Sequence, residues 1–382
     1  MDNLNKAHLK IISILQEYDK VSYHTLLKLT GMSRSGLRGR ISEIRKLGYN
    51  INKERENNNI YLSLNEDNTV TLKEPVTDSV KLETRNKNMT QFSELIEFIN
   101  ELKQSNKNYK PNSITNTYNE YDKTRQGVLL LSDIHVGQET SHIPFNDDIA
   151  RYRLEQLTEK TLTYLKDNNI KKLNILMLGD IIEGDMIFKN QTFSIKHSAL
   201  EQVRMATRFL SNMFNEFLLN GIQLEVTGVR GNHGITNYKN IEEDNWDNVV
   251  YAMLDIIFND KKNIDFYYIN KSESLYYVGK RKILLTHGEN FPEQIKTSSG
   301  LKEFRGKCSM YKLDQGDIIV AGHYHTFGIE HDQDRLLIRN GALSSVSEYA
   351  VQRSLYSTPE QTLLLFNNTD IVYPIIIPIE LE

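Results

Sequence analysis

The chain has 382 residues, a formal net charge of −4 and a single cysteine. This length predicts two or three domains with a sizeable core rather than one small domain. One cysteine excludes an internal disulfide and a zinc cluster built from thiolates. Because no apolar run is long enough to span a membrane and the first residues are polar and charged, we expect no signal peptide, no membrane contact and a cytoplasmic location.

The charge is divided unevenly along the chain. Residues 1–66 contain eleven Lys or Arg against seven Asp or Glu, a balance of +4 that leaves −8 for the rest. A basic segment joined to an acidic one favours nucleic-acid contact by the basic part. We therefore expect a DNA-binding head (residues 1–66), a linker (67–124) and a body (125–382).

Three helices are predicted in the head, because its apolar residues recur at helical spacing. The first covers about residues 5–18. The second follows Ser22, a suitable N-cap, and ends before Gly31. The third begins at Ser33, another suitable N-cap, and ends at Gly48. One face of this third helix is apolar, and the rest is rich in arginine and lysine.

Two short strands should follow, Tyr49–Asn52 and Ile60–Leu64, joined by a polar turn at Lys53–Asn59. Three helices and a hairpin, with Met32-Ser33-Arg34-Ser35 at the turn before a basic third helix, resemble a winged helix-turn-helix domain. The resemblance is to the type at the N-terminus of biotin-operon repressors, over residues 21–48. In that family the third helix enters the major groove of DNA. The residues that this implies for DNA contact are Ser33, Arg34, Ser35, Arg38, Arg40, Arg45 and Lys46.

An alternative role for the same head is protein docking, with the arginines simply facing solvent. The few phosphate contacts available predict modest, salt-sensitive DNA binding.

The linker is mostly polar, which is typical of a mobile segment. It contains one exception, a predicted amphipathic helix at about residues 90–104. Its apolar positions are Phe92, Leu95, Ile96, Ile99 and Leu102. We expect this helix to pack on one of the two domains. The alternative is that it joins two copies of the chain in a homo-oligomer.

In the body, strand-like runs alternate with amphipathic segments, which predicts an α/β layered domain with helices outside. The strand candidates are Val128–Leu131, Leu173–Leu178, Ile222–Thr227, Ile283–Thr286 and Ile318–Ala321, with Leu363–Phe366 and Ile371–Ile377 as closing strands. The helical candidates are Asp147–Lys166, Ser198–Leu219 and Ile241–Phe258. Two prolines in the last strand suit a sheet edge.

Side chains that can bind metal follow five of these strand candidates. Asp133 and His135, two residues apart after an apolar run, should point to the same side. The later strand ends carry Asp180, then Asn232 with His233, then His287, then His323 with His325. Five of the ten histidines therefore lie at strand ends. Because active groups in layered α/β domains sit where strands end, these clusters predict one shared site.

Together the clusters resemble the five ordered motifs of the calcineurin-like metallophosphoesterase superfamily, in order and in strand context. The resemblance implies a two-layer β-sandwich flanked by helices and holding two divalent ions. By motif, Asp133, His135 and His325 would bind one ion, Asn232, His287 and His323 the other, and Asp180 would bridge them. Carboxylate, amide and imidazole ligands without thiolate favour Mn²⁺, with Fe and Zn²⁺ as alternatives.

The resemblance also implies that a metal-activated hydroxide attacks the phosphate while His233 donates a proton to the leaving oxygen. Many members follow the Asn-His pair with an acidic residue that orients the histidine, but Gly234 stands here. Glu183, Asp185 and Asp244 are the candidates to replace it.

Three functions are compatible with these features. The first is a dinuclear-metal phosphoesterase that acts as a DNA nuclease and is brought to DNA by its head. The second is a phosphatase or cyclic-nucleotide phosphodiesterase for a small or protein substrate, which the acidic body favours slightly. The third is a metal-binding transcriptional regulator without turnover. Weaker candidates for contact with substrate are Arg230 and Tyr324, and the run Asn340–Tyr349 is a candidate to close over the site.

Overall fold

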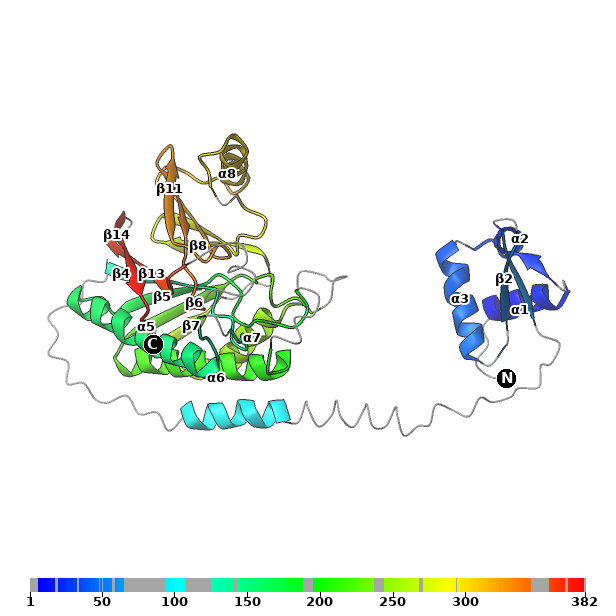
Figure 1. Cartoon of the computed structure of the whole chain (residues 1–382), viewed down its shortest axis with the longest axis horizontal. Coiled ribbons are helices and arrows are strands. Elements are labelled where there is room, and N and C mark those ends of the chain that lie inside the picture. The colour runs from blue at the N-terminus through cyan, green and yellow to red at the C-terminus, as the bar shows by residue number, and fades with distance from the viewer. Residues whose placement is uncertain are drawn as a thin grey trace. The chain divides into compact units, whose positions relative to one another are not determined.

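The computed structural model divides into two compact units, Met1–Glu94 and Leu95–Glu382, each described here by itself (Figure 1). The structure describes residues 6–17, 20–32, 34–47, 49, 51–56, 59–64, 94–106, 125–140, 143–187, 195–236, 244–267, 271–292, 294–344, 357–367 and 370–380. In this part of the chain, no helix combines the length and the apolar character that crossing a bilayer requires.

The first unit contains the three predicted helices, α1 (Lys6–Glu17), α2 (Tyr23–Thr30) and α3 (Arg34–Lys46). The Ser22 Oγ accepts a hydrogen bond from the Thr25 N–H at 3.0 Å, as expected for an N-cap. Gly31 ends α2 with φ 70°, a left-handed conformation that glycine adopts without steric cost. Ser33 and Gly48, the predicted ends of the third helix, lie outside the described residues.

The hairpin of the first unit is longer than predicted. Strands β2 (Ile51–Glu56) and β3 (Asn59–Leu64) pair antiparallel, so most of the expected turn at residues 53–59 is strand. The hydrophobic pattern did not predict the extra strand residues, because the side chains of Lys53 and Glu54 are polar and exposed. A two-residue strand, β1 (Val21–Ser22), pairs with β3 and was not predicted, because so short a strand has no periodicity.

The second unit contains a six-stranded sheet in the order β14-β13-β4-β5-β6-β7. Its strands are β4 (Arg125–Leu131), β5 (Lys172–Met177), β6 (Gln223–Gly228), β7 (Ile264–Phe266), β13 (Glu360–Asn367) and β14 (Asp370–Pro378). Strands β4 to β7 run parallel to one another, and β13 and β14 extend the sheet antiparallel. The proline-bearing β14 is an edge strand, as predicted.

A second sheet of five strands has the order β11-β12-β10-β9-β8. Its strands are β8 (Glu273–Val278), β9 (Arg281–Thr286), β10 (Ile318–Ala321), β11 (Gly328–Asp332) and β12 (Arg335–Arg339). The central strands β9, β10 and β12 are parallel, while β8 and β11 close the edges antiparallel.

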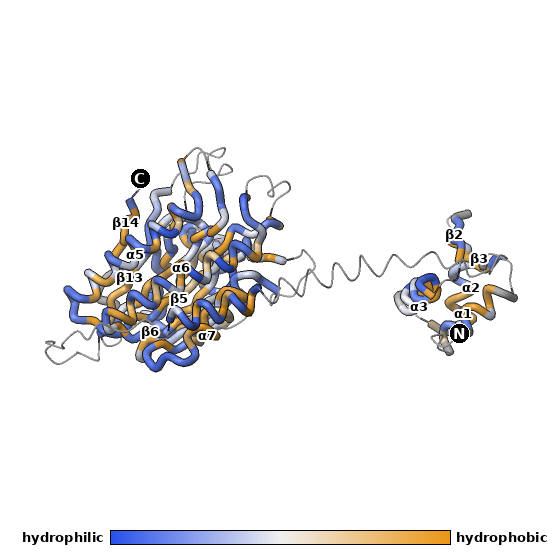
Figure 2. Tube along the Cα trace, turned by 90° about the horizontal axis from the view of Figure 1, so that it is seen from below, coloured by the Kyte–Doolittle hydropathy of each residue, from blue (hydrophilic) through white to orange (hydrophobic). Residues whose placement is uncertain are grey.

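The helices of the second unit cover the outer faces of the two sheets, so the predicted layered α/β arrangement is present (Figure 1). Alternate residues of β4 show the layers: Val128 and Leu130 pack between the sheets, whereas Leu129 and Leu131 pack under the helices. The helices are α5 (Asp147–Asp167), α6 (Ala199–Leu219), α7 (Trp246–Phe258) and α8 (Ser298–Met310). In Figure 2 the trace of α6 alternates between hydrophobic and hydrophilic colours, as expected for a helix with one buried face.

Helix α7 begins at Trp246 rather than at the predicted residue 241, and residues 241–243 lie outside the described part. The Asn245 side chain caps it by accepting a hydrogen bond from the Asp247 N–H at 2.9 Å. The predicted start was wrong because an N-cap was taken for a position inside the helix.

The helix predicted in the linker is present at residues 94–106. It packs on the second unit through buried Phe98 and Leu102. The Arg204 and Arg208 guanidinium groups lie 5.0 and 5.5 Å from the centre of the Phe98 ring. At the end of this helix, the Asn106 Oδ1 accepts a hydrogen bond from the Asn215 Nδ2 at 2.6 Å. The prediction that this helix packs on a domain is confirmed.

Candidate metal centre

The turns after the strands place five site residues in left-handed backbone conformations. The φ angles are 53° for Asp133, 52° for His135, 52° for Asp180, 69° for His323 and 58° for His325. This region is costly for residues that carry a Cβ, by about 1–3 kcal/mol each, and is held only where the surroundings enforce it. The chain therefore bends sharply after β4, β5 and β10, and these bends turn the side chains toward one place.

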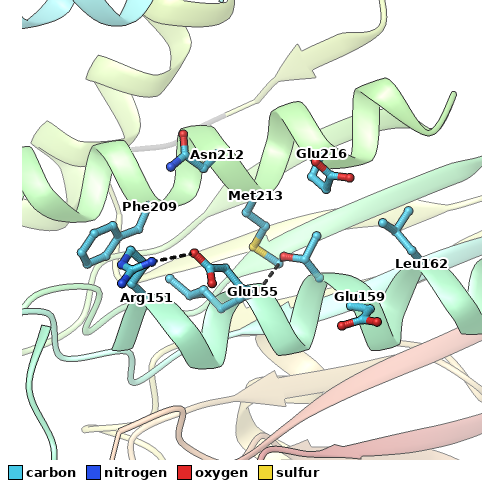
Figure 3. Close-up of a pocket in the computed structure, with 10 residues that line it drawn as sticks. Arg151, Glu155, Glu159, Leu162, Phe209, Asn212, Met213 and Glu216 are labelled. Atoms are coloured by element: carbon cyan, nitrogen blue, oxygen red, sulfur yellow. Dashed lines mark hydrogen bonds and ion pairs between the residues drawn. The ribbon is translucent and has the colours of Figure 1, made fainter. Parts of the chain in front are cut away.

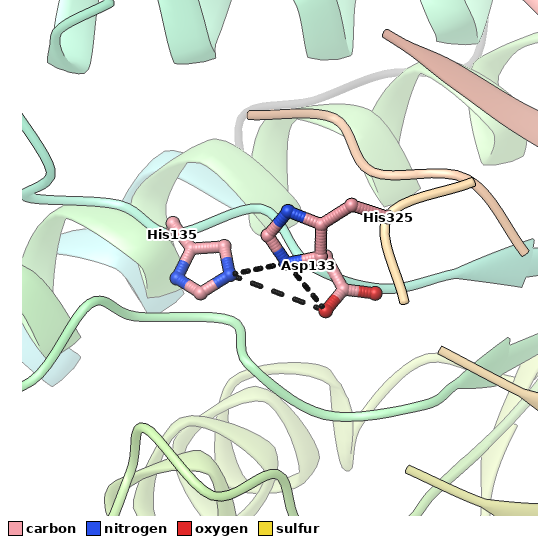
Figure 4. Close-up of side chains that lie close together, drawn as sticks. All are labelled: Asp133, His135 and His325. Atoms are coloured by element: carbon pink, nitrogen blue, oxygen red, sulfur yellow. Dashed lines mark hydrogen bonds and ion pairs between the residues drawn. The ribbon is translucent and has the colours of Figure 1, made fainter. Parts of the chain in front are cut away.

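Asp133, His135 and His325 form the first cluster (Figure 4). The His325 Nε2 lies 3.3 Å from the Asp133 Oδ1 and 3.3 Å from the His135 Nε2. The His135 Nε2 lies 4.0 Å from the Asp133 Oδ1. Asp133 and His135 are buried, and His325 keeps a quarter of its side chain exposed.

The second cluster contains Asn232, His287 and His323. The His287 Nε2 lies 2.9 Å from the Asn232 Oδ1 and 3.3 Å from the His323 Nδ1. Asp180 lies between the two clusters, because its Oδ2 is 3.0 Å from the His287 Nε2 and 3.9 Å from the His135 Nε2. The structure thus brings together all seven residues that the sequence predicted as metal ligands.

Hydrogen bonds behind the clusters fix which atom faces the centre. The His287 Nδ1 donates to the Leu178 carbonyl oxygen at 2.7 Å, and the His135 Nδ1 donates to the Glu183 Oε2 at 2.8 Å. Each ring therefore turns Nε2 toward the centre, where this nitrogen can bind a metal ion once its proton is lost. The Asp180 Oδ1 accepts a hydrogen bond from the His233 N–H at 2.8 Å, which leaves Oδ2 for the centre.

Buried carboxylates and imidazoles at the centre shift one another's pKa values. Burial by itself raises the pKa of Asp180, but the neighbouring imidazoles, His287 first, bring this pKa well below its ordinary value. For His287 the effect of burial has the opposite sign, because burial lowers the pKa of an imidazole. The interaction with the neighbouring Asp180 carboxylate outweighs burial and raises the pKa of His287 to about 10. Buried carboxylates beside imidazole donors, without a thiolate, fit divalent cations.

His233 lies beside the first cluster, with its ring edge-on to His135 at 4.5 Å between centroids. Its Nδ1 is 2.9 Å from the Glu183 carbonyl oxygen and 3.3 Å from the Glu183 Oε2. Burial lowers the pKa of His233, but Asp180 and then Glu183 outweigh it and raise the pKa to about 10. Of the three candidates left open by the sequence, Glu183 is the residue beside the histidine.

Gly234 stands where the resemblance led us to expect an acidic residue, and packing explains why. A Cβ at this position would lie 2.3 Å from the Asn245 Oδ1, closer than any real contact. The Asn245 side chain occupies this space and donates to the Gly231 carbonyl oxygen at 2.8 Å. The orienting group therefore comes from the loop after β5 rather than from the position after His233.

Two weaker predictions acquire structural roles. The Tyr324 hydroxyl donates to the Gly288 carbonyl oxygen at 3.2 Å and to the Phe291 carbonyl oxygen, which anchors the loop after β9. Arg230 pairs with Glu289 at 3.2 Å next to the second cluster.

The expectation that residues 340–349 close over the site is not met by their described part, residues 340–344. Leu343 and Ser344 are buried, and their N–H groups both donate to the Asp133 carbonyl oxygen at 3.1 Å, so this segment supports the site from within. Residues 345–349 lie outside the described part.

Sequence reasoning missed Asp247, which is fully buried at the start of α7. Its carboxylate accepts hydrogen bonds from the backbone N–H groups of Asp180, Ile181 and Gly231. The available signal was the Asn-x-Asp pattern of a helix N-terminus, which was placed inside the predicted helix.

The residues predicted to contact DNA belong to the first unit. Arg38 and Lys46 are exposed on α3. Arg40 pairs with Glu43 at 2.7 Å, and Arg45 donates to the Ile51 carbonyl oxygen at 2.7 Å, which ties α3 to β2. Ser33 lies outside the described residues, as do the side chains of Arg34 and Ser35.

A hollow of about 490 Å³ lies between α5 and α6 (Figure 3). It is lined by Arg151, Leu154, Glu155, Thr158, Glu159, Leu162, Phe209, Asn212, Met213 and Glu216. None of these residues belongs to the metal-binding clusters, so this hollow is separate from the centre.

Comparison with known proteins assigns the chain to a family. Residues 127–358 match the calcineurin-like phosphoesterase superfamily domain. The SPbeta prophage-derived uncharacterized protein YonJ of Bacillus subtilis (strain 168) is 19% identical over 224 residues. This match covers 56% of this chain and 55% of YonJ, so the chain spans about half the length of this curated relative.

Solved structures that match the chain do so at low sequence identity and low TM-score. Vacuolar Protein Sorting 29 from Cryptosporidium parvum is 13% identical with a TM-score of 0.36, covering 67% of this chain and 92% of that one. The phosphoesterase YfcE from E. coli is 15% identical with a TM-score of 0.31, covering 66% and 99%. Because the family match extends over more than half of its residues, the chain belongs to the calcineurin-like phosphoesterase superfamily.

Proposed function

We propose that the protein is a dinuclear-metal-dependent phosphoesterase that hydrolyses DNA, with its head as the DNA-binding part. The observation that carries the proposal is the joining of two donor clusters by the Asp180 carboxylate, with His233 beside them. A phosphodiester is suited to such a centre, because two cations offset the charge of the phosphate and orient it for attack.

Seven side chains would hold the ions. Asp133, His135 and His325 would hold one, Asn232, His287 and His323 the other, and Asp180 both. Two divalent ions, with Mn²⁺ the first choice and Fe or Zn²⁺ as alternatives, would supply an activated water and offset negative charge on the leaving oxygen.

His233 would act as the general acid. Its pKa of about 10 keeps the ring protonated at neutral pH. With Nδ1 held by the Glu183 carbonyl oxygen, the proton on Nε2 is the one available for the leaving oxygen. Glu183 also holds His135, so a single carboxylate orients both a ligand and the proton donor.

Several features of the head support DNA as the substrate. Three helices and an antiparallel sheet stand in the order of a winged helix-turn-helix domain, and exposed Arg38 and Lys46 lie on α3. The balance of +4 in residues 1–66 adds long-range attraction to phosphates. A cytoplasmic location, where DNA is accessible and a lone cysteine stays reduced, completes the proposal.

The helix at residues 94–106 offers a second surface besides the one packed on the body. Ile96 is 46% exposed on it. A homo-oligomer formed through this helix would use that surface.

The test of the nuclease is cleavage of end-labelled single- and double-stranded DNA with and without Mn²⁺. We expect Mn²⁺-dependent cleavage that Asp180→Ala and His323→Ala abolish. The matched control is Asp148→Ala, since this carboxylate is 90% exposed on α5.

The outcomes separate the candidate functions. Intact DNA together with hydrolysis of bis(4-nitrophenyl) phosphate would exclude the nuclease and support a phosphodiesterase for small substrates. Hydrolysis of 4-nitrophenyl phosphate alone would support a phosphatase. DNA binding without turnover of any ester would support a transcriptional regulator.

A further inference from the structure

Asp247 contacts two loops of the centre, one that carries Asp180 and one that carries Asn232 and His233. Its Oδ2 accepts hydrogen bonds from the Asp180 N–H at 3.0 Å and the Gly231 N–H at 2.8 Å, and its Oδ1 accepts one from the Ile181 N–H at 3.1 Å. We propose that Asp247 is a positioning residue that fixes the distance between the bridging Asp180 and the Asn232-His233 pair. The proposal rests on the two-metal function proposed above.

The two loops follow neighbouring parallel strands, β5 and β6, and touch each other directly. A Cβ on Gly231 would lie 2.1 Å from the Asp180 Oδ1, and one on Gly179 would lie 2.4 Å from the Gly231 nitrogen. Asp180 itself has φ 52°, a left-handed conformation that is costly for residues with a Cβ. Because the two loops are in such close contact, a shift of one loop would displace the other. A group that holds both loops in place would prevent such a shift.

Two residues at the N-terminus of α7, Asn245 and Asp247, hold the backbone of Gly231 from both sides. Asp247 holds the Gly231 N–H, while the Asn245 Nδ2 donates to the Gly231 carbonyl oxygen at 2.8 Å. The next two residues are Asn232 and His233, and the His233 N–H donates to the Asp180 Oδ1 at 2.8 Å. The position of helix α7 thereby fixes the Asp180 Oδ2, which lies 3.0 Å from the His287 Nε2 and 3.9 Å from the His135 Nε2.

A carboxylate is required at this position. Three N–H donors converge on two oxygens, and a carboxamide would turn an N–H₂ toward at least one of them. Capping of α7 does not explain Asp247, because Asn245 is already the N-cap. A fully buried second carboxylate next to Asp180 is also costly for folding, and a role at the centre accounts for it.

The experiment compares Asp247→Asn with Asp255→Asn in the full-length chain. Asp255 is on the same helix and partly exposed, so its variant controls for the loss of one charge from α7. Mn²⁺ binding is measured by isothermal titration calorimetry, and bound metal by elemental analysis. Unfolding of the metal-free proteins is followed by thermal denaturation.

We expect Asp255→Asn to bind Mn²⁺ like the unaltered protein and Asp247→Asn to bind it about 10- to 100-fold more weakly. A merely structural role predicts a lower melting temperature of the metal-free protein with Mn²⁺ affinity within twofold of the unaltered protein, and that result would overturn the proposal. If Asp247→Asn does not fold, Asp247→Ser, which leaves space for a water, is judged by the same affinities.

The two proposals fail in different ways. An unaltered protein that binds no divalent metal would contradict the proposed function and, with it, the role of Asp247. Normal metal binding by a folded Asp247 variant would overturn the positioning role alone.

Discussion

His287 shows at the scale of one residue how burial and charge compete in the centre. Burial lowers the pKa of the imidazole, but Asp180, 3.0 Å away, raises it to about 10. In the metal-free protein the ring is therefore protonated at neutral pH. Because its folded pKa lies above the ordinary 6.5, the stability it adds is complete below pH 6.5 and is lost as pH rises through 10.

Metal binding should accordingly become tighter as pH rises. A divalent ion must displace the proton from the His287 Nε2, so the apparent Mn²⁺ affinity should rise about tenfold per pH unit for each proton released. Calorimetric titrations at pH 6, 7 and 8, repeated in buffers with different heats of ionisation, measure both affinity and proton release. An affinity that does not change with pH would contradict the assignment, whereas His331→Gln, at an exposed position, should keep the full slope.

His233 makes a prediction that depends on the leaving group. In His233→Ala, esters with a poor leaving group, such as an alkoxide, should lose about 10²- to 10⁴-fold in kcat, because nothing protonates the leaving oxygen. Esters of 4-nitrophenol should lose much less, since nitrophenolate departs without a proton. Parallel kinetics on both ester types, with metal content confirmed unchanged, make the measurement. Equal losses on both would refute the general-acid role.

At the scale of elements, the loops after β5 and β6 and the start of α7 form one packed unit. The Trp246 N–H donates to the Gly234 carbonyl oxygen at 2.7 Å, directly beside the Asn245 side chain. These contacts explain why an acidic residue after His233 is excluded in this chain. They also make the glycine at position 234 a structural requirement.

Gly234→Ala should therefore destabilise the body. The added Cβ would overlap the Asn245 Oδ1 and disturb the cap of α7, at a cost of about 1–3 kcal/mol in the free energy of unfolding. The matched control is Gly306→Ala in α8, where a Cβ meets nothing within 4 Å and alanine should be neutral or stabilising by up to about 1 kcal/mol. Urea denaturation of both variants measures their free energies of unfolding. Equal midpoints for the two variants would show that the packing argument is wrong.

At the scale of the whole molecule, the candidate metal ligands lie in one of the two compact units. Among the residues that the structure describes, the side-chain groups that could hold a metal ion all belong to residues 95–382. A ligand stabilises only the folded unit that holds it, by about 2.7 kcal/mol when its concentration is one hundred times its Kd.

Metal removal should therefore shift only one of two unfolding transitions. Calorimetric scans with EDTA and with excess Mn²⁺ should show one transition that moves upward with metal and one that does not move. Asp180→Ala serves as the control, because both of its transitions should be insensitive to Mn²⁺. A single transition, or equal shifts of both, would mean that the units unfold together.

The sequence by itself predicted most of the helices, the strands that carry the site and the seven clustered residues, but not β7, β8, β11, β12 or α8. Apolar runs such as residues 128–131, the helical period of α5 and the polar groups after each strand are properties of contiguous residues, so they can be read locally. The layered α/β body followed from their alternation. The short β1 and the full length of the hairpin did not follow, since few or polar residues leave no periodic signal.

Only the tertiary structure decided which distant groups meet. Glu183 rather than Asp185 or Asp244 stands beside His233, 50 residues along the chain, and Asp247 holds the N–H of Asp180 from 67 residues away. The space that excludes a side chain at Gly234 is likewise filled by an asparagine from another element. Such contacts depend on how strands and helices pack against one another. The order of residue types along the chain does not specify which of several carboxylates lies beside a given histidine.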